Sequence, residues 1–206
     1  MPPHGHSCEG DNNHHESPET GLEYSLYAKI DRENLECLNE VVDGSGKTIF
    51  KPWEERLNFN VYVESDADEE LLFNIPFTGN VKLKGIIVIG DDSDSHPSKM
   101  RLFKNRPHMT FDDVASSPDQ EFDLHVDSTG SLEYSTKIVT FSSVYHLTMH
   151  FPTNFGGSST RIYYIGLRGD FTEGHRHGVT ICAYEARANI SDHKNPLDEN
   201  VSYQIQ

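Results

Sequence analysis

KIVTFSSVYHLTMHF, residues 137–151, alternates apolar and polar side chains with a period of two. The face that runs from Val139 and Phe141 to Met149 and Phe151 is almost wholly apolar. Successive side chains of a β-strand point to opposite faces of the sheet, so this pattern predicts a strand with one buried side. We expect the strand to span the whole stretch and to belong to a sheet that covers a core.

Two histidines lie on the opposite face of the same stretch, at His146 and His150. Their spacing of four residues separates them by about 13 Å along a strand, so they cannot share a metal ion directly. Histidine on the polar face of a half-buried strand is usually exposed. We therefore expect both side chains to face solvent.

Other stretches also favour strands, because they are rich in β-branched and aromatic residues. They are EFDLHV (121–126, with Val126 on the buried face), RIYYIGLRG (161–169), GVTICAYEAR (178–187) and NVKLKGIIVIG (80–90). The last alternates at first and then runs apolar from Ile86 to Ile89, as in a strand that is covered on both faces. Turn residues punctuate these runs at 78–80, 91–94, 128–130 and 154–157.

Many short strands with regular turns predict an all-β protein, a jelly-roll β-sandwich of the galactose-binding-like type. We expect one short helix near the N-terminus, where Asp31 is a candidate N-cap for RENLECLNE (32–40). We expect residues 1–20 to form a disordered His-rich arm and 21–190 the domain. Residues 191–206 would then form a flexible C-terminal tail.

The chain carries 17 Lys and Arg against 33 Asp and Glu, a net charge of −16. This charge disfavours nucleic acid and anionic membrane surfaces as partners, while basic protein surfaces remain possible. Three widely spaced cysteines and a polar N-terminus without an apolar signal core indicate a reduced intracellular protein. We expect a cytoplasmic monomer, with a nuclear location also open.

Gly46-Lys47-Thr48 invites comparison with a phosphate-binding loop, but Val41 stands where that motif needs its first glycine. Pro52 also disfavours the helix that should follow, so we expect a turn. The 92–97 stretch lacks the glycine of an EF-hand, although an irregular Ca²⁺ site at Asp92 and Asp94 stays open. Loose metal binding by the His-rich arm also stays open. No catalytic motif is present, and we expect a non-enzymatic protein without cofactor, nucleotide or intrinsic metal.

The stretch VESDADEELLFNIPF, residues 63–77, carries five carboxylates just ahead of an apolar run. We expect an exposed acidic loop that leads into a core strand, and we take it as the candidate docking site for a basic partner surface. Alternatively, some of these carboxylates cap turns or pair with Arg56, Lys82 or Arg161 and so serve the fold. The five candidate residues are Glu64, Asp66, Asp68, Glu69 and Glu70.

Several blocks occur together in an order that resembles the PITH-domain family, whose name stands for proteasome-interacting thioredoxin-like. The blocks are NLECLNE (34–40), FKPWEER (50–56), ESDADEELLFNIPF (64–77), GNVKLKGI (79–86) and YIGLRGD (164–170). The closest resemblance is to small members that consist of one such domain with short tails. The better-known relative carries a thioredoxin domain, whereas this chain has no Cys-x-x-Cys, so redox activity is not transferred.

The resemblance implies a jelly-roll sandwich that binds the proteasome regulatory particle or a similar assembly. It also leaves open a regulatory role in gene expression or cell differentiation. The family provides no established catalytic residues to carry over. A different class of function also stays open, namely a lectin-like module that binds a small ligand or carbohydrate at the loop ends, with Trp53 and Phe155 as candidate exposed aromatics.

Overall fold

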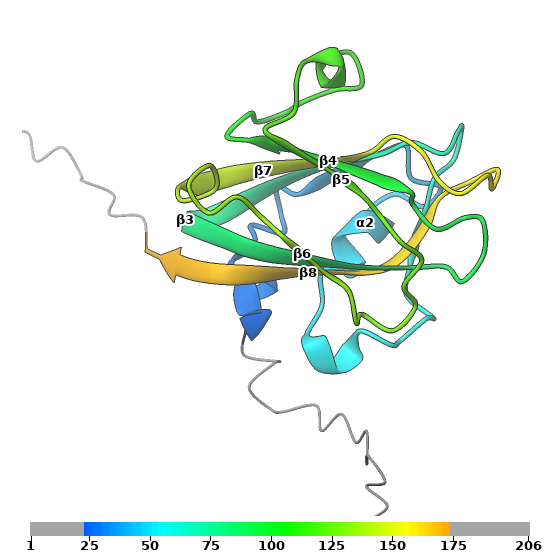
Figure 1. The fold of residues 1–206 in the computed structure, drawn as a ribbon, viewed down its shortest axis with the longest axis horizontal. Coiled ribbons are helices and arrows are strands. Elements are labelled where there is room, and N and C mark those ends of the chain that lie inside the picture. Colours follow the sequence, from blue (N-terminus) through cyan, green and yellow to red (C-terminus); the bar gives the residue numbers. More distant parts are fainter. Residues whose placement is uncertain (1–22, 174–206) are drawn as a thin grey trace, which may run out of the picture. The chain divides into compact units, whose positions relative to one another are not determined.

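The computed structural model describes residues 23–173, which form a mostly antiparallel β-sandwich with a few short helices (Figure 1). The predicted all-β sandwich is therefore confirmed. In chain order the elements are η1 Ser25–Lys29, β1 Glu36–Leu38, α2 Ser45–Thr48, η2 Trp53–Glu55, β2 Val63–Glu64, β3 Leu71–Gly90, β4 Lys99–Lys104, η3 Asp113–Ala115, β5 Gln120–Asp123, β6 Glu133–Ser135, β7 Val144–Phe151 and β8 Arg161–Thr172.

Strand β3 is 20 residues long and takes part in both layers of the sandwich. Its first part, from Leu71 to Pro76, pairs with β1 on one edge and β7 on the other, and β7 continues to β4 and β5. Its second part, from Asn80 to Gly90, pairs with β8 and β6, and β8 continues to β2. All of these pairs are antiparallel. In Figure 1, β4 and β7 lie in one layer and β6 and β8 in the other.

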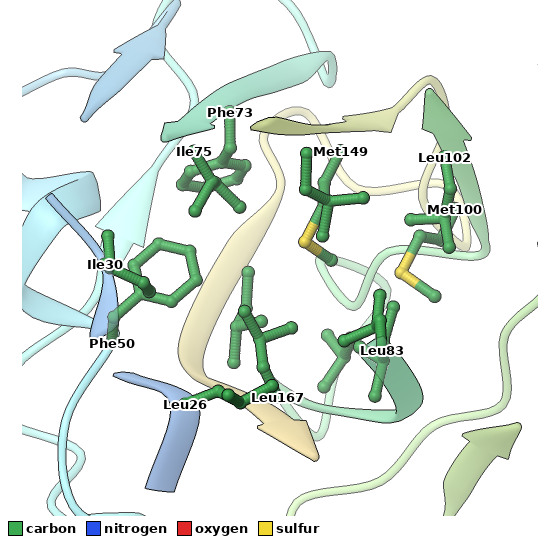
Figure 2. Packing of buried hydrophobic residues seen from close by; sticks show 14 of the residues in the cluster. Leu26, Ile30, Phe50, Phe73, Ile75, Leu83, Met100, Leu102, Met149 and Leu167 are labelled. Atoms are coloured by element: carbon green, nitrogen blue, oxygen red, sulfur yellow. The ribbon is translucent and has the colours of Figure 1, made fainter. Parts of the chain in front are cut away.

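The main core lies between the two layers, as Figure 2 shows in close-up. Phe73 and Ile75 project into it from the first part of β3, and Leu83 from the second part. Met149 of β7 and Leu167 of β8 meet them there, and all five side chains are fully buried. This alternation of buried residues along each strand is what the period of two predicts.

The outer faces of both layers are covered as well. Ile87 and Ile89 of β3 pack with Tyr24 and Tyr164 in a second cluster. Leu72 lies on the outer face of the first part of β3, in a third cluster with Phe103, Met109 and Val114. The prediction that residues 86–89 are covered on both faces is therefore confirmed.

The prediction that His146 and His150 face solvent is wrong, since their exposed fractions are 6 % and 2 %. The two residues lie on the outer face of β7, where Thr148 between them is also fully buried. The segment that follows β4 folds back over this face, and Phe111 packs edge-on against His150 with ring centroids 6.3 Å apart. The sequence pattern of β7 alone could not show this cover, which comes from a different part of the chain.

The helix predicted over residues 32–40 is also wrong, because residues 36–38 form strand β1. Cys37 packs against the main core, whereas Leu38 packs against the outer cluster of Phe103 and Met109. Pairing with β3 and burial on both sides outweigh a weak local helical preference. The short α-helix of this region falls further on, at α2.

Three other boundaries differ from the predictions. The predicted strand at 137–151 begins only at Val144, and Val139 is 91 % exposed. The predicted turn at 78–80 lies within β3, where the pairing with β7 is interrupted between Pro76 and Val81. The predicted strand at 121–126 ends at Asp123, and Val126 is exposed. The strand predicted at 178–187, the arm at 1–20 and the tail at 191–206 lie outside the described residues, and their boundaries stay predictions.

Candidate functional site: the acidic loop

The acidic loop, residues 64–70, joins β2 to β3 and is fixed by its backbone. The amide N–H of Ser65 donates to the carbonyl oxygen of Thr160 at 3.0 Å, and the Thr160 N–H donates to Ser65 Oγ at 2.8 Å. Ser65 is buried, and it forms an isolated antiparallel bridge with Glu40. The backbone of this loop is therefore held in a defined position on the edge of the sandwich.

Asn39 holds the tip of the acidic loop. Its backbone φ of 68° is left-handed, a conformation that Asn tolerates better than most residues. Its Nδ2 donates to Oδ1 of Asp68 and to the carbonyl oxygen of Glu70, both at 2.7 Å. Its Oδ1 accepts the N–H of Ala67 at 3.0 Å, and its carbonyl accepts the N–H of Asp66 at 3.0 Å. One residue thus connects the end of β1 to most of the loop.

Glu64 lies against Arg161, one of the partners that the sequence left open. Its carboxylate accepts hydrogen bonds from Arg161 Nη2 at 3.0 Å and from Ser159 Oγ at 2.8 Å. Partial burial opposes ionisation, but these two bonds prevail and lower the pKa of Glu64. The negative charge of Glu64 is therefore paired with Arg161 within the domain.

The side chains of Asp68 and Glu70 also contact other residues of the domain. Besides accepting from Asn39, the Asp68 carboxylate accepts the N–H of Glu70 at 3.0 Å, which caps the turn between them. The Glu70 carboxylate lies 3.4 Å from Nε2 of His150. Burial, together with the negative charges of Asp68 and Glu69, raises the pKa of Glu70.

Asp66 and Glu69 differ from the other three. Neither carboxylate makes a hydrogen bond or an ion pair within residues 23–173, and Asp66 is exposed. The backbone around them is nonetheless tied down, since the Glu69 carbonyl accepts from Thr160 Oγ1 at 2.6 Å. Within residues 23–173, three of the five predicted residues therefore have side-chain partners, whereas Asp66 and Glu69 have none.

The stretch that resembles a phosphate-binding loop binds the carboxylate of Glu40, a residue of the same chain. Oε1 of Glu40 accepts the N–H of Gly44 at 2.5 Å, and its Oε2 accepts the N–H of Gly46 at 2.6 Å and Ser45 Oγ at 3.1 Å. Gly44 has a φ of 81°, and a Cβ at Gly46 would lie 2.4 Å from Cβ of Cys37. These glycines serve a tight turn into α2, and its N–H groups are already occupied.

The candidate aromatic residues of a sugar site have different surroundings. The Trp53 indole stacks on Tyr24 at 5.0 Å between ring centroids, and the Arg56 guanidinium lies 4.1 Å from its ring centroid. This indole is therefore engaged by the fold and is not free to stack on a sugar. Phe155 is 44 % exposed and lies near His96, at 6.0 Å between centroids.

Further chemistry is sparse in the part of the chain that the structure describes. Within residues 23–173, no three His, Cys, Asp or Glu side chains gather as metal ligands, including those around Asp92 and Asp94. The Cys37 thiol is half-buried, and burial raises its pKa, which disfavours the reactive thiolate. Over the same residues, no helix has the length and apolar character needed to cross a bilayer.

The sequence did not single out Asn39 and Glu40, the two residues that organise this site. Asn39 carried a weak signal, because Asn readily adopts a left-handed backbone beside a turn. Glu40 stands four residues before Gly44, at a spacing that suits a carboxylate folded back on a glycine turn. Neither signal identifies a partner without the coordinates, because the contacts depend on how β1 and β2 approach each other.

Fold and site together define an antiparallel β-sandwich protein with a rigid acidic loop on one edge. A family model for the PITH domain matches residues 16–188, and the chain belongs to the PITH domain family. It is 61 % identical to a PITH domain-containing protein of Drosophila melanogaster, over 99 % of this chain and 100 % of that protein. It is 60 % identical to PITH domain-containing protein 1 of Homo sapiens, over 93 % of each chain.

Solved structures with partial similarity include a fucose binding module of Streptococcus pneumoniae. It is 12 % identical, with a TM-score of 0.49, over 75 % of this chain and 100 % of the module. A family 32 carbohydrate-binding module from NanJ of C. perfringens, solved with galactose, is 9 % identical with a TM-score of 0.47. It covers 68 % of this chain and 97 % of that module.

Proposed function

We propose that this protein is a non-enzymatic interaction module that binds the proteasome regulatory particle in the cytoplasm, and that the acidic loop contributes to docking. Membership of a family named for proteasome interaction supports the choice of partner. The observation that carries the choice of surface is that, within residues 23–173, the carboxylates of Asp66 and Glu69 lack partners on a loop whose backbone is fixed by Asn39 and Thr160.

Electrostatics supports the same surface. The chain has a net charge of −16, so a basic patch on a partner is attracted from a distance. Exposed charges at the rim of an interface mainly accelerate association, and salt screens their effect. A fixed loop also loses little conformational entropy when it docks. The free carboxylates should therefore act on the association rate and much less on the stability of the fold.

The test measures association of the purified full-length protein with purified regulatory particle at low and at moderate salt. The variant Asp66→Asn/Glu69→Gln removes the two free charges. The control Asp92→Asn/Asp94→Asn removes two exposed charges from another turn, so both proteins change net charge equally. We expect association at low salt to slow by about threefold or more for the loop variant alone, and to converge with wild type as salt rises.

Melting temperatures should match that of the wild-type protein for both variants. A wild-type protein that fails to bind the particle would overturn the proposed partner. Equal slowing of the two variants would mean that net charge acts without regard to position, and would overturn the role of the loop.

A further inference from the structure

An apolar groove lies beside the acidic loop, between the turn that leads into α2 and the segment that leads into β2. Its volume is about 410 Å³. Val41, Val42, Val61 and Tyr62 contribute its apolar lining, and Asp43 and Glu64 also line it. Val41 and Val42 are 54 % and 64 % exposed, so the groove presents two adjacent aliphatic side chains to solvent.

The fold itself holds these two valines outward. The N–H of Val41 donates to the Glu64 carbonyl at 2.9 Å, and the Val42 carbonyl accepts the N–H of Ser45 at 3.0 Å. Just beyond, the Glu40 carboxylate clamps the N–H groups of Gly44 and Gly46. The valines therefore cannot fold inward to escape water, and their exposure is a fixed property of the surface.

The Tyr62 side of the groove is also preformed. The Tyr62 ring lies 4.9 Å from the Arg161 guanidinium and packs edge-on against Tyr163, with centroids 6.0 Å apart. Phe59 packs on the same tyrosine at 5.0 Å between centroids. A groove with both walls fixed before binding suits a ligand that inserts a side chain without rearranging the protein.

The charge around the groove identifies the chemistry of its occupant. Antiparallel pairing of Glu40 with Ser65 brings the groove against the acidic loop, so the exposed Asp43 and Asp66 both belong to this surface. Among the described residues, the Glu64 charge is paired with Arg161, whereas Asp43, Asp66 and Glu69 form no ion pair and can attract cations. A mostly apolar groove that includes and adjoins acidic residues fits an apolar side chain that is flanked by Lys or Arg.

The charge of the terminal residues argues against the chain's own ends as the occupant. Residues 1–22 contain no Lys or Arg and carry four acidic residues, Glu9, Asp11, Glu16 and Glu19. In residues 174–206 the acidic residues outnumber the basic ones, with Glu185, Asp192, Asp198 and Glu199 against Arg176, Arg187 and Lys194. A second copy of the chain would bring another net charge of −16. Charge complementarity therefore favours an occupant from a different protein.

We propose that this groove is the anchoring site for a basic partner segment whose aliphatic or aromatic side chain inserts between Val42 and Tyr62. In taking that partner to be the regulatory particle, the inference rests on the proposed function. The free carboxylates then guide the segment to the groove, while burial of the valines holds it there and slows dissociation.

The first test uses a synthetic probe, so that it does not depend on the proteasome. A capped hexapeptide with Leu-Ile at its centre and two Lys on each side is titrated into isotope-labelled full-length protein, and amide shifts are recorded. Matched peptides replace the lysines by Glu or the Leu-Ile pair by Ser. We expect saturable shifts at residues 41–45 and 60–64 for the first peptide alone. Shifts located elsewhere, or equal binding of the three peptides, would overturn the proposal.

The second test uses paired variants. Val41→Asn/Val42→Asn removes apolar surface without changing charge, and Ile138→Asn/Val139→Asn makes the same change at a second exposed apolar pair, 48 % and 91 % exposed. We expect the first variant to bind the peptide and the regulatory particle about tenfold more weakly, chiefly through faster dissociation, and the second to change affinity less than about twofold.

The outcomes separate this inference from the proposed function. If the wild-type protein and both variants bind the particle equally well, the role of the groove is refuted and the proposed partner is not. If the peptide binds in the groove but the particle does not bind to the protein, the proposed partner is refuted and the groove is supported. New shifts of residues 174–206 in Val41→Asn/Val42→Asn without peptide would place the chain's own residues in the groove and refute an external occupant.

Discussion

Oε2 of Glu70 lies 3.4 Å from Nε2 of His150, and neither ring nitrogen of this histidine makes a hydrogen bond within residues 23–173. The His150 side chain is only 3 % exposed. Burial, together with the positive charge of Arg101, lowers the pKa of His150 to about 4. His150 is therefore neutral at pH 7, and its contact with Glu70 is not an ion pair there.

The first prediction concerns acid sensitivity. The pKa of His150 is about 4 in the fold and about 6.5 in the unfolded chain, so between these values the unfolded chain binds the extra proton. The free energy of unfolding should fall as pH drops from about 6.5 to about 4, and His150 should account for about 2–3 kcal/mol of that loss. The raised pKa of Glu70 acts in the opposite direction and offsets part of it.

Urea unfolding at several pH values measures this dependence. His150→Phe should flatten the pH profile, even if it also changes stability at pH 7, while His125→Gln, at an exposed side chain, should leave the slope as it is. His96 and His146 also have lowered pKa values through burial and should supply the slope that remains. An unchanged profile in His150→Phe would contradict the assignment.

The second prediction concerns Asn39, which has two separable roles. Asn39→Gly removes the side-chain bonds to Asp68, Ala67 and Glu70 but accepts the left-handed φ, and should cost about 1–2 kcal/mol of unfolding free energy. Asn39→Ala adds the penalty of that φ and should cost about 1 kcal/mol more. Urea denaturation resolves the difference, with Asn60→Ala as a control at an exposed loop position. Equal costs for the two variants would exclude a contribution from the backbone angle.

The third prediction concerns the turn into α2. Glu40→Gln keeps the size of the side chain but presents an NH₂ group to one of the two backbone donors, at Gly44 or Gly46. Since charge-assisted hydrogen bonds are stronger than neutral ones, we expect a loss of about 1–2 kcal/mol of unfolding free energy. Glu33→Gln removes an equal charge from a nearby exposed side chain and should be neutral. Chemical denaturation measures both, and equal stability of the two variants would argue against the clamp.

A fourth prediction concerns the cover over the second layer of the sandwich. Glu133 of β6 accepts from Arg168 Nε at 2.8 Å and Nη2 at 2.5 Å, and it also accepts the Tyr24 hydroxyl. Tyr24→Phe keeps the ring packed on Trp53 but removes that bond, and should cost about 1 kcal/mol in a thermal or urea unfolding measurement. Tyr145→Phe, at a ring 57 % exposed, is the matched control and should be silent.

The sequence correctly predicted those parts of the fold in which the pattern of apolar residues along one strand determines its burial. Residues 80–90 alternate and then run apolar, and the strand is buried in that same order. The prediction failed where cover comes from a distant segment, as for His150 beneath Phe111. It also failed where pairing overrides local preference, as in β1, because strand partners far apart in the chain leave no local trace.

The candidate site was predictable to a similar extent. A dense run of carboxylates identified the loop, and the sequence correctly left open that some of them pair within the fold, as Glu64 does with Arg161. Which carboxylates are free could not be predicted, because that depends on Asn39 and on Thr160, which is about 90 residues further along the chain. The apolar groove was missed, since Val41 and Val42 are exposed only by the turn that Glu40 holds.

Strand β3, which is shared by both layers, also affects how the protein folds during its synthesis. Its partners β7 and β8 lie at Val144–Phe151 and Arg161–Thr172, so a ribosome that has just released Gly90 has produced a strand whose two main neighbours do not yet exist. Translation at about 5–20 residues per second delays those neighbours by several seconds. During that interval the apolar faces and open edges of β3 are a hazard for aggregation. Nascent chains that end before β8 should therefore depend on chaperones in a way that the finished sandwich does not.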